Sequence, residues 1–558
     1  MLEAVYVKTV RVIAVILTGY LFLQGLFTLC NIQRIEEKTF FVKNNPLTGI
    51  LGILAFTFLI KLLSMPKIWN FLQKYGQLIT GICIALFCGF MLWWITHTVF
   101  WYYGDMEKVY MCAGNLLAGD FSQWKPGGYA YMWPFQDGLI LFVAGLLKVF
   151  TVNQTYYIFP AINVIFSVLT VWSVCKTWQI LSEDKALLCL QGIFMVCYLP
   201  YAFLSMLLYG NQIGYGFSAL AVYLTVKYTH TGHLRNLIFS GICMTLGICF
   251  KPNCMILFIG ICAILFLDIF ATKKVLRKQL ITKIVITVSF MILVPATSAL
   301  PEICVEQMSG MHIAGGNSKW AHIAMGLQES DMAPGWYNCY NENLFVQNNY
   351  DTEKTAADAK LSIVSSLENF AHNPAYAWEF FNKKNASQWN NPTFECFHIQ
   401  NSRNTSMELS GFVLSAINDG GKLNILLIYV LDILQSVLLF GILIYFLHTK
   451  DRDHRQFIWA LLFIGAFVFW TFWEAKSRYV APYFLFLMPY AFMGYRILAD
   501  RFKEKKIQIS LAILALCILF IGFSNAGWIK SSFKIDQDTE DYYEYIHQYN
   551  HNFMNLRF

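Results

Sequence analysis

The stretch WYYGDMEKVYMCAGNLLAGD, residues 101–120, follows directly on a long apolar run. It places two carboxylates, Asp105 and Glu107, within a few residues of an expected membrane edge. Uncompensated charge is costly at such a position, so acids found there need a partner or a task. The apolar positions after Asp105 recur at helical spacing, which predicts a short amphipathic helix along the interface. Asp105 is its expected N-cap and Gly119 its expected stop.

The composition around this stretch predicts a membrane protein. The 558-residue chain is 57% hydrophobic and only 13% charged, about half the charge of an average soluble protein. Charge-free runs recur from end to end, which predicts an all-α polytopic membrane protein with about 13 transmembrane helices. The runs lie near 9–30, 47–64, 76–100, 156–181, 186–208, 211–228, 236–250, 253–271, 281–300, 423–447, 456–473, 479–498 and 507–529.

The positive charges predict the orientation of these helices. The net charge of +7 is small and lies mostly in short loops, so it indicates topology rather than a nucleic-acid partner. We expect four basic connections to lie inside: Lys8 and Arg11; Lys273, Lys274, Arg277, Lys278 and Lys283; Lys450, Arg452 and Arg455; and Arg496, Arg501, Lys503, Lys505 and Lys506. This requires one apolar run between 136 and 300 not to cross. The run near 137–150 is short for a span, so we expect a re-entrant or interfacial segment; the alternative is that it crosses.

This topology divides the chain into four parts. Residues 1–300 form an N-terminal transmembrane module, whose first outer loop is 101–136. Residues 301–422 form a large extracytoplasmic loop, residues 423–529 the C-terminal transmembrane helices, and residues 530–558 an extracytoplasmic tail. The turns at Lys251 and at Glu474–Arg478 fall on the same outer side, so we expect any chemistry there.

Aromatic and polar side chains are dense in the two large outer segments. The first contains FSQWKPGGYAYMWPFQDG, with Lys125 and Trp133, and the second contains Trp320, His322, Trp336 and Tyr337. Flat faces beside polar groups suit carbohydrate, although aromatic residues are also common at any membrane interface. Neither the scattered histidines nor the fifteen cysteines show the spacing of a standard metal site, so no metal site is expected. A disulfide among Cys112, Cys304, Cys339 and Cys396 stays open.

Four short motifs, taken in order, resemble a known superfamily. They are YYGDMEKVY (102–110), YMWPFQDG (131–138), GICFKPN (247–253) and FWEAKSRYVAPYFLFLMP (472–489). Their order and sidedness resemble the GT-C superfamily of integral-membrane glycosyltransferases. Within it they are most similar to the branch of protein O-mannosyltransferases and aminoarabinose transferases, which use a polyprenyl-phosphate sugar such as an undecaprenyl-phosphate sugar. The resemblance covers most of residues 76–498, and each motif is short and degenerate.

The resemblance implies a function and a site. The function is transfer of a sugar from a polyprenyl-phosphate donor to a cell-envelope acceptor (a cell-wall polysaccharide, teichoic acid, glycolipid or protein) on the outer face of a multi-pass protein of the cell membrane. Asp105 matches the catalytic first-loop Asp, and Glu107 is a second acidic candidate. Arg478, Lys251 and Lys125 are candidates for the donor phosphate. Candidates for substrate binding are Tyr103, Trp133, Trp320, His322, Trp336, Tyr337, Glu474 and Tyr479. No cofactor is expected; a divalent metal, used in some branches, is disfavoured.

Other interpretations remain open. Asp105 could merely cap its helix, Glu474 and Arg478 could pair with each other on a continuing helix, and Lys251 could extend to the interface for solvation. A polysaccharide polymerase or ligase using a lipid-diphosphate oligosaccharide would also need arginine and aromatic residues outside, but not the first-loop acid. A lipid-sugar transporter or flippase would place charged residues near mid-membrane in repeated halves, and the sequence shows no convincing repeat.

Overall fold

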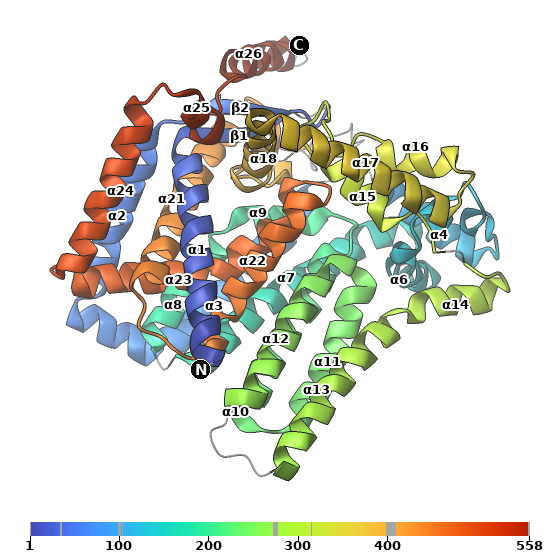
Figure 1. The fold of residues 1–558 in the computed structure, drawn as a ribbon, viewed down its shortest axis with the longest axis horizontal. Helices are drawn as coiled ribbons and strands as arrows, with labels where there is room; N and C mark the ends of the chain where they lie inside the picture. Colours follow the sequence, from blue (N-terminus) through green and yellow to red (C-terminus); the bar gives the residue numbers. More distant parts are fainter. Residues whose placement is uncertain are drawn as a thin grey trace.

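The computed structural model describes residues 2–33, 36–98, 102, 104–182, 184–271, 277–313, 315–397 and 409–555. Long apolar helices form its main body (Figure 1). They are α1 Leu2–Phe27, α2 Pro46–Leu63, α3 Pro66–His97, α7 Val152–Leu181, α8 Lys185–Val196, α10 Asn211–Thr231, α11 Leu234–Phe250, α12 Met255–Ala271, α13 Arg277–Ser298, α21 Lys422–His448, α22 Ile458–Phe472, α23 Ala481–Arg501 and α24 Lys505–Phe523.

Shorter elements connect and cover these helices. Before α14 they are α4 Asp105–Leu117, η1 Ser122–Trp124, α5 Tyr129–Met132, η2 Pro134–Gln136, α6 Asp137–Val149, α9 Leu199–Phe203, η3 Leu204–Met206 and η4 Pro252–Cys254. From α14 on they are α14 Leu300–Ser309, α15 Lys319–Gly326, α16 Tyr340–Gln347, α17 Thr352–His372, α18 Pro374–Trp389, α20 Gly411–Ile417, η5 His454–Phe457, η6 Ser477–Tyr479, α25 Gly527–Phe533 and α26 Thr539–Asn555.

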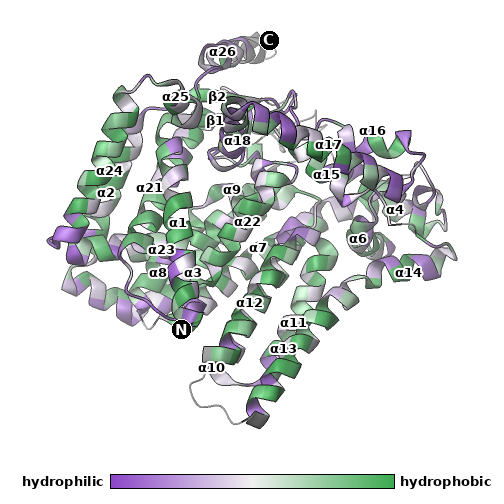
Figure 2. Cartoon of the chain, in the orientation of Figure 1, coloured by the Kyte–Doolittle hydropathy of each residue, from purple (hydrophilic) through white to green (hydrophobic). Residues whose placement is uncertain are grey.

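The helical, multi-span architecture is confirmed. In the described part of the chain, nine helices are long and apolar enough to cross a membrane, or up to eleven if each of two bent helix pairs counts as one span. The expected number of thirteen therefore stays a prediction. Hydrophobic residues cover the long helices, whereas hydrophilic residues collect on α16, α17 and α26 (Figure 2). The first helix packs against α21, so the two ends of the chain share one bundle.

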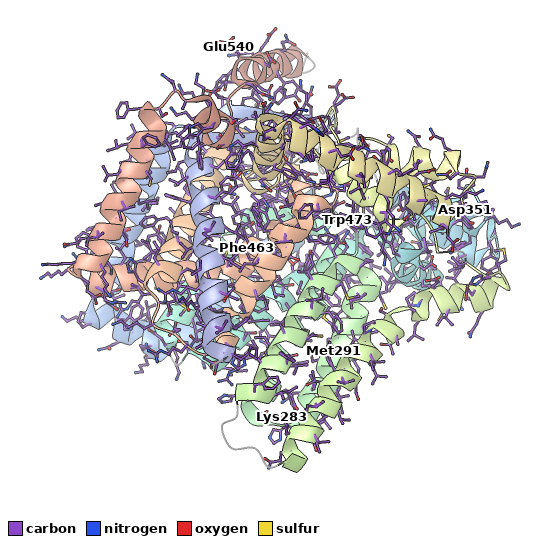
Figure 3. All side chains as sticks on the ribbon, in the orientation of Figure 1. Lys283, Met291, Asp351, Phe463, Trp473 and Glu540 are labelled. Atoms are coloured by element: carbon purple, nitrogen blue, oxygen red, sulfur yellow. The ribbon has the colours of Figure 1, made fainter. Side chains whose placement is uncertain are left out.

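The two ends of the bundle differ in what they carry. The "loop end" is the end at which α15 to α18 and α26 lie, and the "N-terminal end" is the opposite one (Figure 1). In Figure 3, Lys283 lies toward the N-terminal end, away from Asp351 and Glu540.

Hydrogen bonds and an ion pair join three of the four basic connections at the N-terminal end. Arg11 donates to Thr449 O over 3.1 Å, Arg501 donates to His448 O over 3.2 Å, and His454 pairs with Glu3. These contacts bring three of the four connections together; that this end faces the inside stays a prediction.

One feature corrects the all-α expectation. Residues Thr28–Ile32 and Thr39–Lys43 form an antiparallel two-stranded hairpin, β1 and β2, directly after α1. The first apolar run was expected to continue as helix to about residue 30. Cys30 N donates to Asn390 O over 3.0 Å, so a tertiary contact accompanies the early end of the helix. The hairpin lies at the loop end beside α18 and α26.

The short apolar run near 137–150 forms α6, as a separate helix. The segment with α5 before it and the segment with α6 meet at a bend of 92°. α6 packs mainly against α4, the helix that begins with Asp105. A sharp bend fits either a re-entrant segment or a broken span, so whether this run crosses stays a prediction. Its packing nevertheless fixes one face of α4 and hence the position of Asp105.

Candidate active site

Asp105 begins α4, and its carboxylate contacts a tyrosine from a distant part of the chain. The expected N-cap is wrong by one position, because Gly104 is the N-cap, with φ 58°, and Asp105 is the first helical residue. A positive φ suits glycine, which has no Cβ. Asp105 Oδ2 accepts a hydrogen bond from the Tyr209 hydroxyl. The carboxylate therefore serves a tertiary contact instead of capping its helix.

Tyr209 is held in place because its loop packs tightly on the end of α11. A Cβ on Gly210 would lie 1.8 Å from Phe250 O, a distance that no side chain tolerates. Glycine is therefore required where this loop approaches the helix end. The loop sets Tyr209 beside Lys251, which directly follows the last residue of α11, as the sequence predicted.

Two cations share the faces of two tyrosine rings at this point. Lys251 Nζ lies 5.3 Å from the ring centroid of Tyr209 and 5.3 Å from that of Tyr479. Arg478 Cζ lies 5.7 Å and 5.9 Å from the same two centroids. These distances are within the range of cation–π attraction. The site thus places two positive side chains next to the tyrosine that donates to Asp105.

Arg478 is oriented by a carboxylate that the sequence analysis did not single out. Arg478 Nη1 donates to Glu395 Oε2 over 3.1 Å. The other oxygen, Oε1, accepts from the backbone N and the hydroxyl of Ser477 over 2.9 Å and 2.8 Å. The side chain of Glu395 is fully buried, and pairing plus hydrogen bonding is what a buried charge requires. The alternative pairing of Arg478 with Glu474 is wrong, because α22 ends at Phe472 and no helix joins the two residues.

The backbone that presents Glu395 is strained. Phe394 and Glu395 have φ values of 49° and 60°, in the left-handed region that residues with a Cβ rarely adopt. Asn391 Oδ1 stabilises the turn by accepting from Thr393 N and Phe394 N, each over 3.0 Å. Strain of this kind costs about 1–3 kcal/mol per residue and is concentrated at functional sites. The segment therefore holds Glu395 in place at an energetic cost.

Glu474 is the second acid near Asp105. Burial raises the pKa of the Glu474 carboxyl to about 7; the charge of Asp105 adds to this rise, while Lys476 and Arg478 oppose it. Burial and the charge of Arg478 lower the pKa of Lys251 to about 8, and Asp105 and Glu474 oppose that change. These mutual effects place the two acids and two cations within one electrostatic site.

His322 and Trp133 border this site, as expected. The His322 ring stacks on Trp473 with centroids 5.0 Å apart and lies 5.4 Å from the Trp133 ring. Its Nδ1 is 3.9 Å from Glu474 Oε2. Burial lowers the pKa of His322 to about 4, so the ring is neutral at physiological pH. An uncharged imidazole and two indole rings thus form an aromatic wall next to Glu474.

Trp473 is itself held by a buried lysine. Lys384 of α18 donates to Gly326 O and, over 2.8 Å, to Trp473 O. Burial lowers the pKa of Lys384 to about 7, and the charge of Glu474 opposes this. Lys384 therefore connects the large loop to the chain segment that carries Glu474 and Arg478.

Tyr337 contacts Glu342, and the charge of Asp105 acts on Glu342. Its hydroxyl donates to Glu342 Oε1 over 2.9 Å. The pKa of Glu342 is raised, first by burial and also by the charge of Asp105. Tyr337 thus borders the site through Glu342.

Three other candidates have no contact with this cluster in the described part of the chain, and a fourth, Trp336, lies against the segment that carries Glu474. Glu107 is exposed on α4, and its charge acts on Tyr156. Lys125 is exposed and acts on Asp120. Trp320 is 44% exposed beneath Lys360, whose Nζ lies 5.0 Å from the ring. Trp336 has Lys476 Nζ 5.2 Å from its ring centroid, but it is fully buried and donates to Ser387 Oγ over 2.8 Å, so it is part of the core and not open to a sugar. Tyr103 lies outside the described residues.

The structure also bears on metals and disulfides. All fifteen cysteines are free, so the disulfide left open among Cys112, Cys304, Cys339 and Cys396 is absent. Within the described ranges, one group of three potential ligands has its atoms within 4.8 Å of one another: Glu3, Asp453 and His454. It lies at the N-terminal end, and Asp453 is already paired with Arg455.

No protein-family model matches this chain, and no curated protein matches its sequence.

Sequence reasoning missed several residues of the site, above all Tyr209 and Glu395. Tyr209 stands immediately before a glycine and a helix, in LLYGNQ, and Glu395 follows a proline and an asparagine pair in NNPTFE. Glycine and proline mark such segments as turns, but they do not say which side chain a turn presents. In the sequence, the signal available for Glu395 was an acid close to two phenylalanines, in FECF.

Proposed function

We propose that this protein is a membrane-bound glycosyltransferase that moves a sugar from a polyprenyl phosphate to a hydroxyl group of a cell-envelope acceptor at the outer face. The observation that carries the proposal is the meeting of Asp105 with Lys251 and Arg478 around Tyr209. Such a reaction needs a base for the acceptor and cations for the departing phosphate. The site offers a base and two cations, and the side chains of all three contact Tyr209.

The residues suggest a direct displacement. The acceptor hydroxyl oxygen attacks the anomeric carbon, and Asp105 takes the proton. The bond between the anomeric carbon and the phosphate oxygen breaks, and its electron pair leaves with the phosphate. Arg478 and Lys251 stabilise the negative charge on the leaving phosphate, and the planar guanidinium suits two parallel bonds to it. One displacement inverts the configuration at the anomeric carbon.

A small apolar cavity lies next to this site. Its volume is about 10 Å³, and it lies between the end of α8, the middle of α21, the start of α23 and the strained segment. Its lining includes Phe194, Tyr198, Phe394 and Phe484, and Phe394 is the neighbour of the carboxylate that orients Arg478. These apolar side chains next to Arg478 suit the lipid part of a polyprenyl-phosphate donor.

The test is transfer by membranes that contain Asp105→Asn. The donors are radiolabelled undecaprenyl-phosphate mannose, glucose, N-acetylglucosamine and aminoarabinose, and the readout is release of undecaprenyl phosphate. We expect the rate to fall by about 10²- to 10⁴-fold, because the amide cannot accept the acceptor's proton. Glu107→Gln is the matched control on the same helix and should keep the parental rate. Full activity of Asp105→Asn at normal protein levels would contradict the proposed base.

A further inference from the structure

Tyr209 contacts both the acid and the two cations of the candidate site. Its hydroxyl donates to Asp105 Oδ2, while the face of its ring lies next to Lys251 and Arg478. Burial and the charge of Asp105 both raise the pKa of the Tyr209 phenol, so the hydroxyl keeps its proton at neutral pH and remains a donor. The hydroxyl and the ring of this one side chain therefore act on different groups.

A second tyrosine hydroxyl reaches the same carboxylate from the segment that follows α4. Tyr129 begins α5, and its hydroxyl is hydrogen-bonded to Asp105. Gln136 Nε2 donates to the Tyr129 oxygen over 3.5 Å, which leaves the hydroxyl hydrogen for the carboxylate. Burial and the charge of Asp105 raise the pKa of this phenol as well. Asp105 is thus bound by donors from two separate parts of the chain.

These two donors restrict a side chain that would otherwise turn freely. Asp105 is exposed at the first position of α4, where a short carboxylate has several staggered rotamers to choose from. A carboxylate has about four sites that accept hydrogen bonds, so two donors fix its plane and leave sites for the proton of an acceptor. A general base needs that orientation, because a misplacement of about 1 Å can lower a rate by about 10²-fold.

Both tyrosines belong to turns that pack tightly. Tyr209 precedes Gly210, the glycine that lies against the end of α11. Tyr129 follows Gly128, where a Cβ would lie 2.3 Å from Gln123 O. Tyr129 N also donates to Gln123 Oε1 over 3.1 Å. Each hydroxyl is therefore presented from a rigid support.

We propose that the hydroxyls of Tyr209 and Tyr129 hold Asp105 in the orientation of a general base. The ring of Tyr209 has a different task, because its face supports the two cations that meet the donor phosphate. The hydroxyls therefore affect the chemical step, whereas the ring affects donor binding. The inference rests on the proposed function, since both tasks belong to the same reaction. It makes both tyrosines positioning residues.

The test compares two variants at position 209 in the purified full-length protein in lipid nanodiscs. The donors are undecaprenyl-phosphate mannose, glucose, N-acetylglucosamine and aminoarabinose, and kcat and the donor KM are measured. Tyr209→Phe removes the hydroxyl alone, so we expect kcat to fall about tenfold while the donor KM stays within about twofold, which also shows that the variant is folded. Tyr209→Leu removes the ring as well, so we expect its donor KM to rise about fivefold in addition.

The second hydroxyl has a matched control on its own helix. Tyr129→Phe should lower kcat about tenfold and leave the donor KM within about twofold of the parental value. Tyr131→Phe changes the other tyrosine of α5, whose ring packs on Phe345 with centroids 6.3 Å apart. This control should keep the parental kcat and KM.

A double variant tests whether the Tyr209 hydroxyl acts through Asp105. In Asp105→Asn the base is absent, so adding Tyr209→Phe should lower the residual rate no further. A further tenfold fall in the double variant would overturn a role that acts through this carboxylate.

Failure of these roles is distinguishable from failure of the proposed function. If the parent releases undecaprenyl phosphate but both phenylalanine variants, at positions 129 and 209, keep the parental kcat, the positioning roles are overturned and the glycosyltransferase stands. An equal rise in donor KM for Tyr209→Phe and Tyr209→Leu would overturn the division between hydroxyl and ring. No release by the parent from any of the donors would overturn the proposed function and these roles with it.

Discussion

Among the charged residues around Tyr209, Lys251 and Glu474 are the two whose charges change near neutral pH. Below about pH 7 the Glu474 carboxyl is protonated and Lys251 is charged. As the pH rises through 7 and 8, Glu474 gains a negative charge and Lys251 loses its positive one. Both changes reduce the positive potential that a donor phosphate meets, so donor binding should weaken on the alkaline side.

Replacing Lys251 by arginine should remove much of this alkaline loss. Arginine stays charged at any pH a protein tolerates, whereas the pKa of Lys251 is lowered to about 8. We expect the donor KM of the parent to rise above about pH 8, and that of Lys251→Arg to rise less, even where its maximal rate is lower. The measurement is the donor KM from acid to alkaline pH. Lys125→Arg, an exposed control, should keep the parental profile; an identical alkaline rise in Lys251→Arg would contradict the assignment.

At the scale of elements, the segment 391–397 decides how Arg478 is presented. It follows α18, turns through two left-handed residues and places Glu395 against Ser477 and Arg478. The arrangement ties the large loop to the short η6 turn. The same loop is tied to Trp473 by Lys384, so two buried ionisable groups, Lys384 and Glu395, fix the segment 473–479.

Glu395→Gln should therefore affect donor binding more than the maximal rate. The amide keeps a hydrogen bond to Arg478 but loses the charge, and hydrogen bonds to charged groups are about twice as strong as neutral ones. We expect the donor KM to rise about tenfold, equivalent to about 1.4 kcal/mol, with a smaller change in kcat. Glu379→Gln, which removes the ion pair with Lys383 on α18, is the control and should change neither. A fall in kcat alone would argue against a role in positioning Arg478.

At the scale of the whole molecule, the two ends of the bundle should face opposite sides of a membrane. Cys339 is exposed at the loop end. Lys503 is exposed in the connection between α23 and α24, which lies at the N-terminal end. In a variant with Cys197 and Cys304 replaced by serine, a membrane-impermeant maleimide should label Cys339 in intact cells. A cysteine introduced as Lys503→Cys should be labelled only after permeabilisation. Labelling of both sites, or of the second alone, in intact cells would contradict the orientation.

The sequence was sufficient to predict which end of the bundle carries the site, but not its interior. Run lengths and basic loops placed Asp105, Lys251 and Arg478 at one end, and all three do lie around Tyr209. Tyr209 itself depends on the close approach of Gly210 to the end of α11, a tertiary contact without a sequence pattern.

The two tryptophans of the large loop also show what the sequence alone could not predict. Trp320 and Trp336 occur in similar aromatic, glycine-rich surroundings, yet one is on the surface and the other is in the core. Packing of the large loop, rather than local composition, decides which of them a ligand can reach.

The most direct test of the central claim is a cryo-EM map of the full-length protein in nanodiscs with undecaprenyl phosphate bound. The claim is that Asp105, Lys251 and Arg478 act on one substrate. It predicts density for the phosphate between the Lys251 ammonium and the Arg478 guanidinium, on the side that faces Asp105. Phosphate density elsewhere, with Lys251 and Arg478 in contact only with tyrosines and Glu395, would contradict it.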